Sequence, residues 1–238
     1  MYKGTNASDG IGIGTAVIVE EAELIITRRE VNDTEAEVQR FKGALETTIA
    51  ETQKMAEDLA ARVGEKEAEI MQGHMMLLSD PMLTGEIENS IENDTVRSEF
   101  AIEIVCNMYA DMFASMGDEL MQQRATDMRD IKVRMQRTLM GLQSVDVSVL
   151  PAGTILVAKD LTPSMTAGIN PANVTGIVTE LGGRTSHSAI LARALEIPAV
   201  VAVNGLLDKV KDGDTVVLDG SAGEGYVNPE AEVKAAYE

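Results

Sequence analysis

The residue of this sequence best placed to do chemistry is His187. It is one of only two histidines, and it directly follows two glycines and three small or polar residues in the run GGRTSH, residues 182–187. Gly182 and Gly183 allow a positive φ or a close approach of the backbone to a ligand. The pattern therefore indicates a loop that brings an imidazole and a ligand together.

The residues around His187 predict the chemistry of this loop. A strand-like run (VTGIVTE, 174–180) precedes it, and Thr185 or Ser186 can cap the helix that SHSAILARAL predicts after it. His187 then lies in the first helical turn, where unpaired N–H groups and the helix dipole favour an anion and disfavour a protonated ring. We expect a neutral imidazole that takes up a phosphoryl group, with Arg184 balancing its charge. Spacing alone leaves a structural, helix-capping histidine about equally open.

Three other patterns offer less chemistry. GIGIG, residues 10–14, lacks the third glycine of a dinucleotide fingerprint and precedes a strand, so it predicts a turn, and no P-loop pattern occurs. Cys106, the only cysteine, lies in the apolar helical run AIEIVCNMYADMF, which favours a buried and inert thiol. No metal site is expected, because the two histidines lie far apart in sequence.

The overall charge limits the classes of partner. The chain has 39 acidic and 20 basic residues, a net charge of −19, which argues against nucleic acid and against anionic membranes. A basic protein partner fits this charge, although solubility alone explains it as well. No signal-peptide core and no apolar run of membrane-spanning length occurs, so a cytoplasmic location is expected.

The middle of the chain is helical in pattern. Apolar residues recur at helical spacing from Val38 to Val63, and a second helix fits residues 64–79. Asp80 and Pro81 resemble an N-cap followed by a proline at the first helical position, and further apolar stripes cover residues 96–116 and 128–142. Four substantial helices with short joints predict an antiparallel helical bundle.

Both ends of the chain have an α/β pattern. Short apolar runs alternate with helix-like segments, as expected of an α/β layer. The predicted fold is an α/β domain built from residues 1–28 and 148–238, with an all-α helical bundle, residues 32–143, inserted into it. The predicted strands are TAVIVE (15–20), TILVA (154–158), VTGIVTE (174–180), AVVAV (199–203) and DTVVLDG (214–220).

His74 ends the second predicted helix in the run MQGHMMLL. A surface or cap histidine is the favoured interpretation, but His74 could also belong to a contact surface, because too many apolar side chains surround it for a single helix face. These side chains are Met75, Met76, Leu77, Leu78, Met82 and Leu83.

The run GGRTSHSAILAR, residues 182–193, closely resembles the phosphohistidine signature shared by Enzyme I of the bacterial phosphoenolpyruvate-dependent sugar phosphotransferase system, pyruvate phosphate dikinase and phosphoenolpyruvate synthase. The runs GTNASDGIGIGTA, GHMMLLSDPML, RATDMRDIKVRM and DLTPSMTA are similar to Enzyme I in particular, although Asp9 stands where proline is usual. The helical insertion is also the Enzyme I arrangement. The resemblance covers essentially the whole chain.

This resemblance implies that His187 accepts a phosphoryl group from phosphoenolpyruvate on Nε2 and passes it to a histidine of the small carrier protein HPr. It implies that Thr166 hydrogen-bonds and orients the imidazole. The helical block is expected to dock HPr through an acidic, Met-rich surface, although Met76 and Leu83 also fit the core of the bundle. The expected contact residues are Glu65, Glu67, His74, Met76, Leu77, Asp80, Met82, Leu83, Phe113 and Arg124.

Enzyme I continues into a (β/α)₈ barrel that binds phosphoenolpyruvate and Mg²⁺, contributes a catalytic cysteine and forms the dimer. Because this chain ends at Glu238, the resemblance implies an N-terminal fragment that exchanges phosphate reversibly with HPr, is not charged by phosphoenolpyruvate alone, is monomeric and has no cofactor of its own. Two alternatives stay open, a dikinase swivel domain and a scaffold module without phosphate chemistry. The lack of an N-terminal sensory domain favours the sugar branch over the nitrogen-regulatory one.

Overall fold

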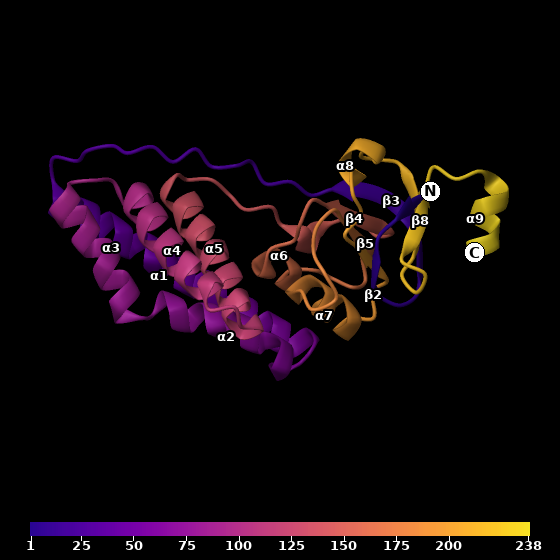
Figure 1. Cartoon of the computed structure of the whole chain (residues 1–238), viewed down its shortest axis with the longest axis horizontal. Coiled ribbons are helices and arrows are strands. Elements are labelled where there is room, and N and C mark those ends of the chain that lie inside the picture. The colour runs from indigo at the N-terminus through magenta and orange to yellow at the C-terminus, as the bar shows by residue number, and fades with distance from the viewer. The chain divides into compact units, whose positions relative to one another are not determined.

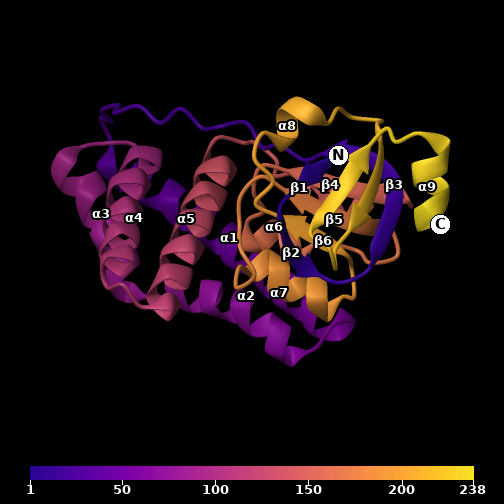
Figure 2. The ribbon, with the colours of Figure 1, turned by 45° about the vertical axis from the view of Figure 1, so that its right-hand side comes forward.

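The computed structural model describes all 238 residues, which form two compact units. Residues 1–21 and 145–238 make up the α/β unit, and residues 22–144 make up the helical unit. Figures 1 and 2 show the first as a sheet with short helices and the second as a group of longer helices. Both ends of the chain therefore build one α/β unit, with an all-α unit inserted between them, which is the predicted fold class.

The α/β unit contains one eight-stranded sheet in the order β1-β8-β7-β3-β4-β5-β6-β2. The central run from β3 through β4 and β5 to β6 is parallel, and the remaining neighbours are antiparallel. The strands are β1 (Tyr2–Lys3), β2 (Thr5–Ser8), β3 (Ile11–Ile18), β4 (Thr154–Ala158), β5 (Val174–Thr179), β6 (Ala199–Val201), β7 (Thr215–Asp219) and β8 (Glu224–Val227).

Short helices complete the α/β unit, and an apolar cluster lies on each face of the sheet. Every residue of β4 is buried, as expected of a parallel strand covered on both faces. Leu156 packs into the cluster that contains α6 and α7 side chains, whereas its neighbour Ile155 packs into the cluster that contains Leu206 of α8. The helices are α6 (Pro163–Ala167), α7 (His187–Ala194), α8 (Leu206–Lys209) and α9 (Ala231–Tyr237).

The glycine string of residues 10–14 is not a turn, and this prediction was wrong. Only Gly10, with φ +117°, lies in the bend, while Gly12 and Gly14 lie inside β3. A Cβ on Gly12 would lie 2.4 Å from the Thr175 carbonyl oxygen, and a Cβ on Gly14 would lie 2.2 Å from that of Gly153. Glycine is required here because the backbone passes close to the chain beside it.

The helical unit contains five long helices, whereas the sequence analysis counted four substantial ones. The N-cap and the helix start that the sequence predicted at Asp80 and Pro81 are confirmed, and they begin a separate helix. The five are α1 (Thr34–Arg62), α2 (Glu65–Leu78), α3 (Pro81–Asp94), α4 (Ser98–Ser115) and α5 (Glu119–Leu139).

Aspartates begin three of these helices. The Asp80 side chain accepts a hydrogen bond from the Met82 N–H at the start of α3, and Asp33 and Asp118 cap α1 and α5 in the same way. An apolar core that includes Phe41, Ile87 and Ile131 joins the helices. None of the helices has the length and apolar composition that crossing a membrane requires.

The boundaries between the units differ from those predicted. Residues 22–28 belong to the helical unit, because the extended chain there is bonded to it: the Arg137 guanidinium donates to the Ala22 carbonyl, and Arg28 donates to that of Asp94. The α/β unit resumes at Val145 instead of residue 148, because Val145 and Val147 pack into the cluster below the sheet.

Candidate active site

The loop after β5 turns the chain into α7. Gly182 has φ +101°, a conformation that glycine adopts without strain, and the hydroxyl of Ser186 donates to the Gly183 carbonyl at 2.7 Å. The same Ser186 oxygen accepts from the Ala189 N–H at 3.3 Å, so Ser186, and not Thr185, is the N-cap of α7.

His187 is the first residue of α7, as the sequence predicted, and the residue as a whole is partly exposed. The ring therefore lies where the helix presents unpaired backbone N–H groups and the positive end of its dipole. The field at this helix terminus would favour a phosphoryl group on the ring, but the Nε2 atom itself is buried, so it must be uncovered before a donor or an acceptor can reach it.

Thr166 lies in α6 and is buried. Its hydroxyl donates to the backbone carbonyls of Pro163, at 2.9 Å, and Thr162, at 3.1 Å. A hydroxyl has a single proton, so the Thr166 oxygen can serve an imidazole only as an acceptor. Side chains of α6 and α7 share one apolar cluster, which includes Met165 and Ala189.

Arg184 forms hydrogen bonds to Asn6 of β2. Its Nε donates to the Asn6 backbone carbonyl at 3.0 Å, and its Nη2 donates to the Asn6 side-chain oxygen. Arg193 completes the arrangement, because its guanidinium donates to the carbonyls of Ala7, at 2.7 Å, and Arg184, at 2.8 Å. Sequence analysis did not single out Arg193, although it closes the GGRTSHSAILAR run. These two arginines fix the loop before α7 against the edge of the sheet.

A hollow adjoins this loop, and its size falls within the range of about 300–1,000 Å³ that is typical of small-molecule sites. Its volume is about 630 Å³, and its lining residues come from the start of the chain and from the loop and helix around Arg184. The lining mixes two arginines with Asp9 and Glu196, so it is not strongly cationic. Nowhere does the structure group three His, Cys, Asp or Glu side chains in a way that could hold a metal ion.

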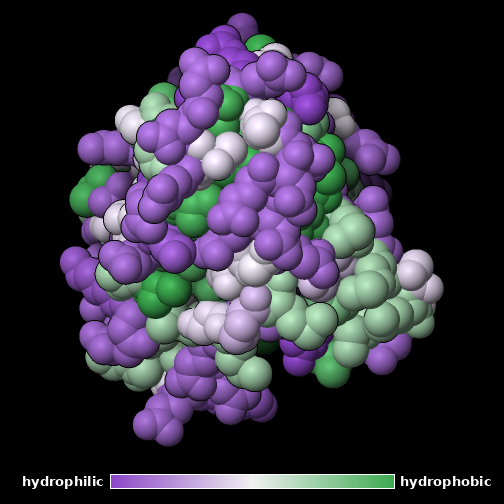
Figure 3. Space-filling view, turned by 90° about the vertical axis from the view of Figure 1, so that its left-hand side faces the viewer, coloured by the Kyte–Doolittle hydropathy of each residue, from purple (hydrophilic) through white to green (hydrophobic).

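Four of the expected partner contacts are open to solvent. Met76 and Met82 are 68% and 69% exposed, unusually high fractions for large apolar side chains, and Glu65 and Asp80 are also exposed. Glu67 is partly buried. In Figure 3, hydrophobic side chains reach the surface as separate patches among hydrophilic ones. Exposed methionines beside carboxylates are suited to contact an apolar surface with a basic rim.

Three other expected contacts are buried. The interpretation of His74 as a surface or cap histidine was wrong, whereas Leu83 follows the core alternative that the sequence left open. His74 is completely buried and its Nε2 lies 3.0 Å from Oδ1 of Asp127 on α5. Leu77 and Leu83 belong to the apolar core. These residues lie on the inner faces of α2 and α3, whereas Met76 and Met82 lie on the exposed faces.

Two expected contacts have mixed surroundings. Phe113 is partly buried against the core, and the Nε atom of Arg124 is buried without a hydrogen-bond partner.

Cys106 is fully buried, and burial raises the pKa of its thiol to about 12. The prediction that this cysteine is buried is therefore confirmed, and the raised pKa keeps its thiol protonated.

Comparison with known proteins shows the family to which the chain belongs. The family model described as "PEP-utilising enzyme, N-terminal" matches residues 3–124, and the one described as "PEP-utilising enzyme, mobile domain" matches residues 150–223. The phosphoenolpyruvate-protein phosphotransferases of Bacillus subtilis (strain 168) and Listeria monocytogenes are 41% and 42% identical to the chain over 236 residues, which is 99% of the chain and 41% of each relative.

Two solved structures are similar over the whole chain. An Enzyme I solution structure (nEIt) is 39% identical with a TM-score of 0.86 and is covered to 96%, and the "N-terminal domain of Enzyme 1 - Nitrogen" is 26% identical with a TM-score of 0.64 and is covered to 98%. The chain therefore belongs to the PEP-utilising enzyme family. Within that family it is similar to the N-terminal domain of Enzyme I, and it spans about two fifths of the length of the curated relatives.

Proposed function

We propose that this chain carries a phosphoryl group on His187 and exchanges it with a histidine of the carrier protein HPr. The observation that supports this most directly is the position of His187, partly exposed at the first residue of a helix that Ser186 caps. The names of the relatives, phosphoenolpyruvate-protein phosphotransferase, agree with phosphoryl transfer as the general chemistry.

In the proposed step, the lone pair of His187 Nε2 attacks the phosphorus of the phosphorylated carrier. The new P–N bond forms as the bond to the carrier's imidazole breaks, and that ring keeps the electron pair, so the exchange is reversible. Nε2 must be unprotonated, which requires the proton on Nδ1. Thr166 suits this tautomer because its oxygen, with its own proton given to the backbone, can accept from Nδ1–H.

The loop residues Gly182, Gly183, Thr185 and Ser186 are proposed to cradle the phosphate with the N-terminus of α7. Arg184 is proposed to contribute charge, but its Nε and Nη2 are occupied by Asn6. Either it donates through Nη1, or it acts mainly by holding the loop. Stabilisation of an anion by a helix terminus is about 0.3–2 kcal/mol, enough to favour the phosphorylated ring without trapping it.

We propose that HPr docks on the helical unit. The exposed methionines Met76 and Met82, with Glu65 and Asp80 near them in sequence, offer an apolar and acidic surface. Of the other expected contacts, Glu67, Phe113 and Arg124 remain candidates, whereas the buried His74, Leu77 and Leu83 would act from below by shaping this surface.

The first test is the variant His187→Ala, incubated with phosphorylated HPr. We expect transfer to be abolished, because no other side chain replaces the nucleophile, while unphosphorylated HPr still binds with an affinity within about twofold. Mass spectrometry locates the phosphoryl group in the parent chain, and calorimetry measures binding by the variant. Phosphate on another side chain, or none at all, would contradict the proposal, and loss of HPr binding in the variant would show that docking and chemistry are not separate.

The second test uses phosphoenolpyruvate as the donor. We expect these 238 residues, prepared by themselves, to remain unlabelled with radioactive phosphoenolpyruvate and Mg²⁺, and to become labelled when phosphorylated HPr is the donor. The physical reason is that activating phosphoenolpyruvate is proposed to need the barrel domain of Enzyme I, where Mg²⁺ would bind. Direct labelling by phosphoenolpyruvate would refute this division of labour.

A further inference from the structure

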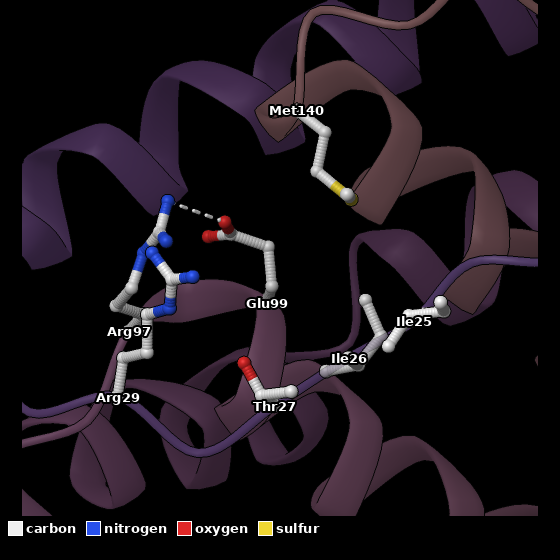
Figure 4. Close-up of a pocket in the computed structure, with 7 residues that line it drawn as sticks. All are labelled: Ile25, Ile26, Thr27, Arg29, Arg97, Glu99 and Met140. Carbon is white, nitrogen blue, oxygen red and sulfur yellow. Dashed lines mark ion pairs between the residues drawn. The ribbon is translucent and has the colours of Figure 1, made fainter.

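A second hollow, independent of the His187 loop, lies within the helical unit. The extended segment that leads into α1 forms one wall, the start of α4 forms another, and Met140, just after α5, closes the third side (Figure 4). Its volume is about 320 Å³, at the lower end of the range for small-molecule sites. Nothing in the proposed phosphoryl transfer uses it.

The walls of this hollow are held in place before any ligand arrives. The Arg97 N–H donates to the Arg29 carbonyl at 3.0 Å, and the Val31 N–H donates to that of Thr95 at 2.9 Å, so the extended segment is tied to the chain just before α4. A carboxylate oxygen of Glu37 accepts from the Ser98 N–H at 2.8 Å and caps α4 from α1. A preformed pocket loses little conformational entropy on binding.

Cationic groups outnumber carboxylates around the hollow. The carboxylate of Glu99 pairs with Arg97 at 2.9 Å and with Arg40, and Glu37 also pairs with Arg40. Burial alone would raise the pKa of Glu37, but hydrogen bonds from Ser98 and Arg40 outweigh this effect and lower the pKa. The Glu37 carboxylate therefore stays charged beside Arg40.

The unbalanced charge belongs to Arg29. Three arginines face two glutamates in this network and its lining, and the guanidinium of Arg29 has no ion pair. Figure 4 shows Arg29 beside Arg97, with the ion pair of Arg97 directed toward Glu99. An excess cation is notable in a chain of net charge −19, because its surroundings repel anions that lack a specific contact.

The remaining wall is apolar and unusually open. Ile25 is 83% exposed and Met140 is 40% exposed, and Ile26 lines the same side. In Figure 4 these side chains lie on the opposite side of the hollow from the two guanidinium groups. The hollow therefore offers cations at one end and apolar surface at the other.

We propose that this hollow binds an amphipathic organic anion, in which a carboxylate or phosphate head contacts Arg29 and Arg97 and a short apolar body covers Ile25 and Met140. Two guanidinium groups suit either head, because each presents paired N–H donors to two oxygens. The apolar body is needed because removing Ile25 and Met140 from water contributes binding that a bare anion lacks.

Nuclear magnetic resonance titration of the folded chain tests the proposal. The probes are octyl phosphate and octanoate, each below its micelle concentration, with inorganic phosphate and octanol as the two halves alone. We expect saturable shifts of the Thr27, Arg29 and Met140 amides with at least one of the two whole probes, and at least tenfold weaker binding of both halves. The tighter whole probe identifies the preferred head.

A matched pair of variants assigns the charge contact. Arg29→Gln should weaken binding about tenfold, the loss expected for one charge-assisted contact, whereas Arg28→Gln, one residue earlier and paired with Glu30, should change it less than twofold. Absence of saturable shifts, equal binding by inorganic phosphate, or equal effects of the two variants would overturn the proposal. Phosphate exchange with HPr is measured separately, so failure of this site leaves the His187 proposal untouched.

Discussion

At the scale of single residues, the position of the Thr166 hydroxyl proton bears on the proposed transfer of phosphate to His187. Thr166 gives its hydroxyl proton to the carbonyls of Pro163 and Thr162, which leaves only its oxygen for the His187 ring. The backbone of α6 thereby sets which role the threonine can play. This role is proposed to select the tautomer with an unprotonated Nε2.

Replacing Thr166 with valine tests this role, because valine keeps the shape and removes the acceptor. We expect phosphate exchange to slow about tenfold, the effect of losing one hydrogen bond, with HPr affinity unchanged. Thr166→Ser, which keeps the oxygen, should restore most of the rate. Long-range ¹H–¹⁵N spectra report the ring tautomer directly, and an unchanged tautomer in the valine variant would refute the orienting role even if the rate fell.

At the scale of elements, close packing of neighbouring backbones explains why β3 has a glycine at position 12. Gly12 lies in β3 with the Thr175 carbonyl 2.4 Å from where a Cβ would be, whereas a Cβ on Gly43 in α1 would meet nothing within 4 Å. The same residue type therefore has opposite functions in the two units. In the sheet it permits packing, and in the helix it only adds flexibility.

The variants Gly12→Ala and Gly43→Ala make this contrast measurable. We expect Gly12→Ala to lower the free energy of unfolding by about 3 kcal/mol, because the methyl group forces two pieces of backbone apart. Gly43→Ala should raise it by up to about 1 kcal/mol, because alanine favours the helix. Urea denaturation followed by circular dichroism measures both, and similar values for the two variants would contradict this account of β3.

At the scale of the whole molecule, the acidic surplus is the dominant feature. A net charge of −19 creates a long-range field that attracts basic proteins and slows their escape from the encounter complex. Because this field acts before any contact forms, it is expected to change the rate at which the proposed carrier HPr associates with the chain.

We expect the association rate with HPr to fall about tenfold between 0.02 and 0.2 M salt, because ions screen the field. Stopped-flow measurement of binding checks the dependence. The variant Met82→Ala serves as the control, since it removes an apolar contact and should raise the dissociation rate without changing the salt dependence. An association rate independent of salt would exclude electrostatic steering by this surface.

Sequence alone determined the features that depend on neighbours along the chain. The cap at Asp80, the helix that begins at His187, the alternation of short strands and helices at the chain ends, and the burial of Cys106 all follow from local propensity and period. Helix caps and hydrophobic periodicity act over a few residues, so they are visible without a tertiary structure.

Only the tertiary structure decided the features that depend on residues far apart in sequence. Gly12 lies in a strand because β3 pairs with β7, where Gly12 is opposite Leu218. Arg184 bonds to Asn6 across 178 positions, and the buried His74 contacts Asp127 on another helix. Met76 and Met82 stayed outside while Leu77 and Leu83 entered the core. A stretch of consecutive apolar residues does not specify which of them face inward, because that choice is made by the helices packed against them.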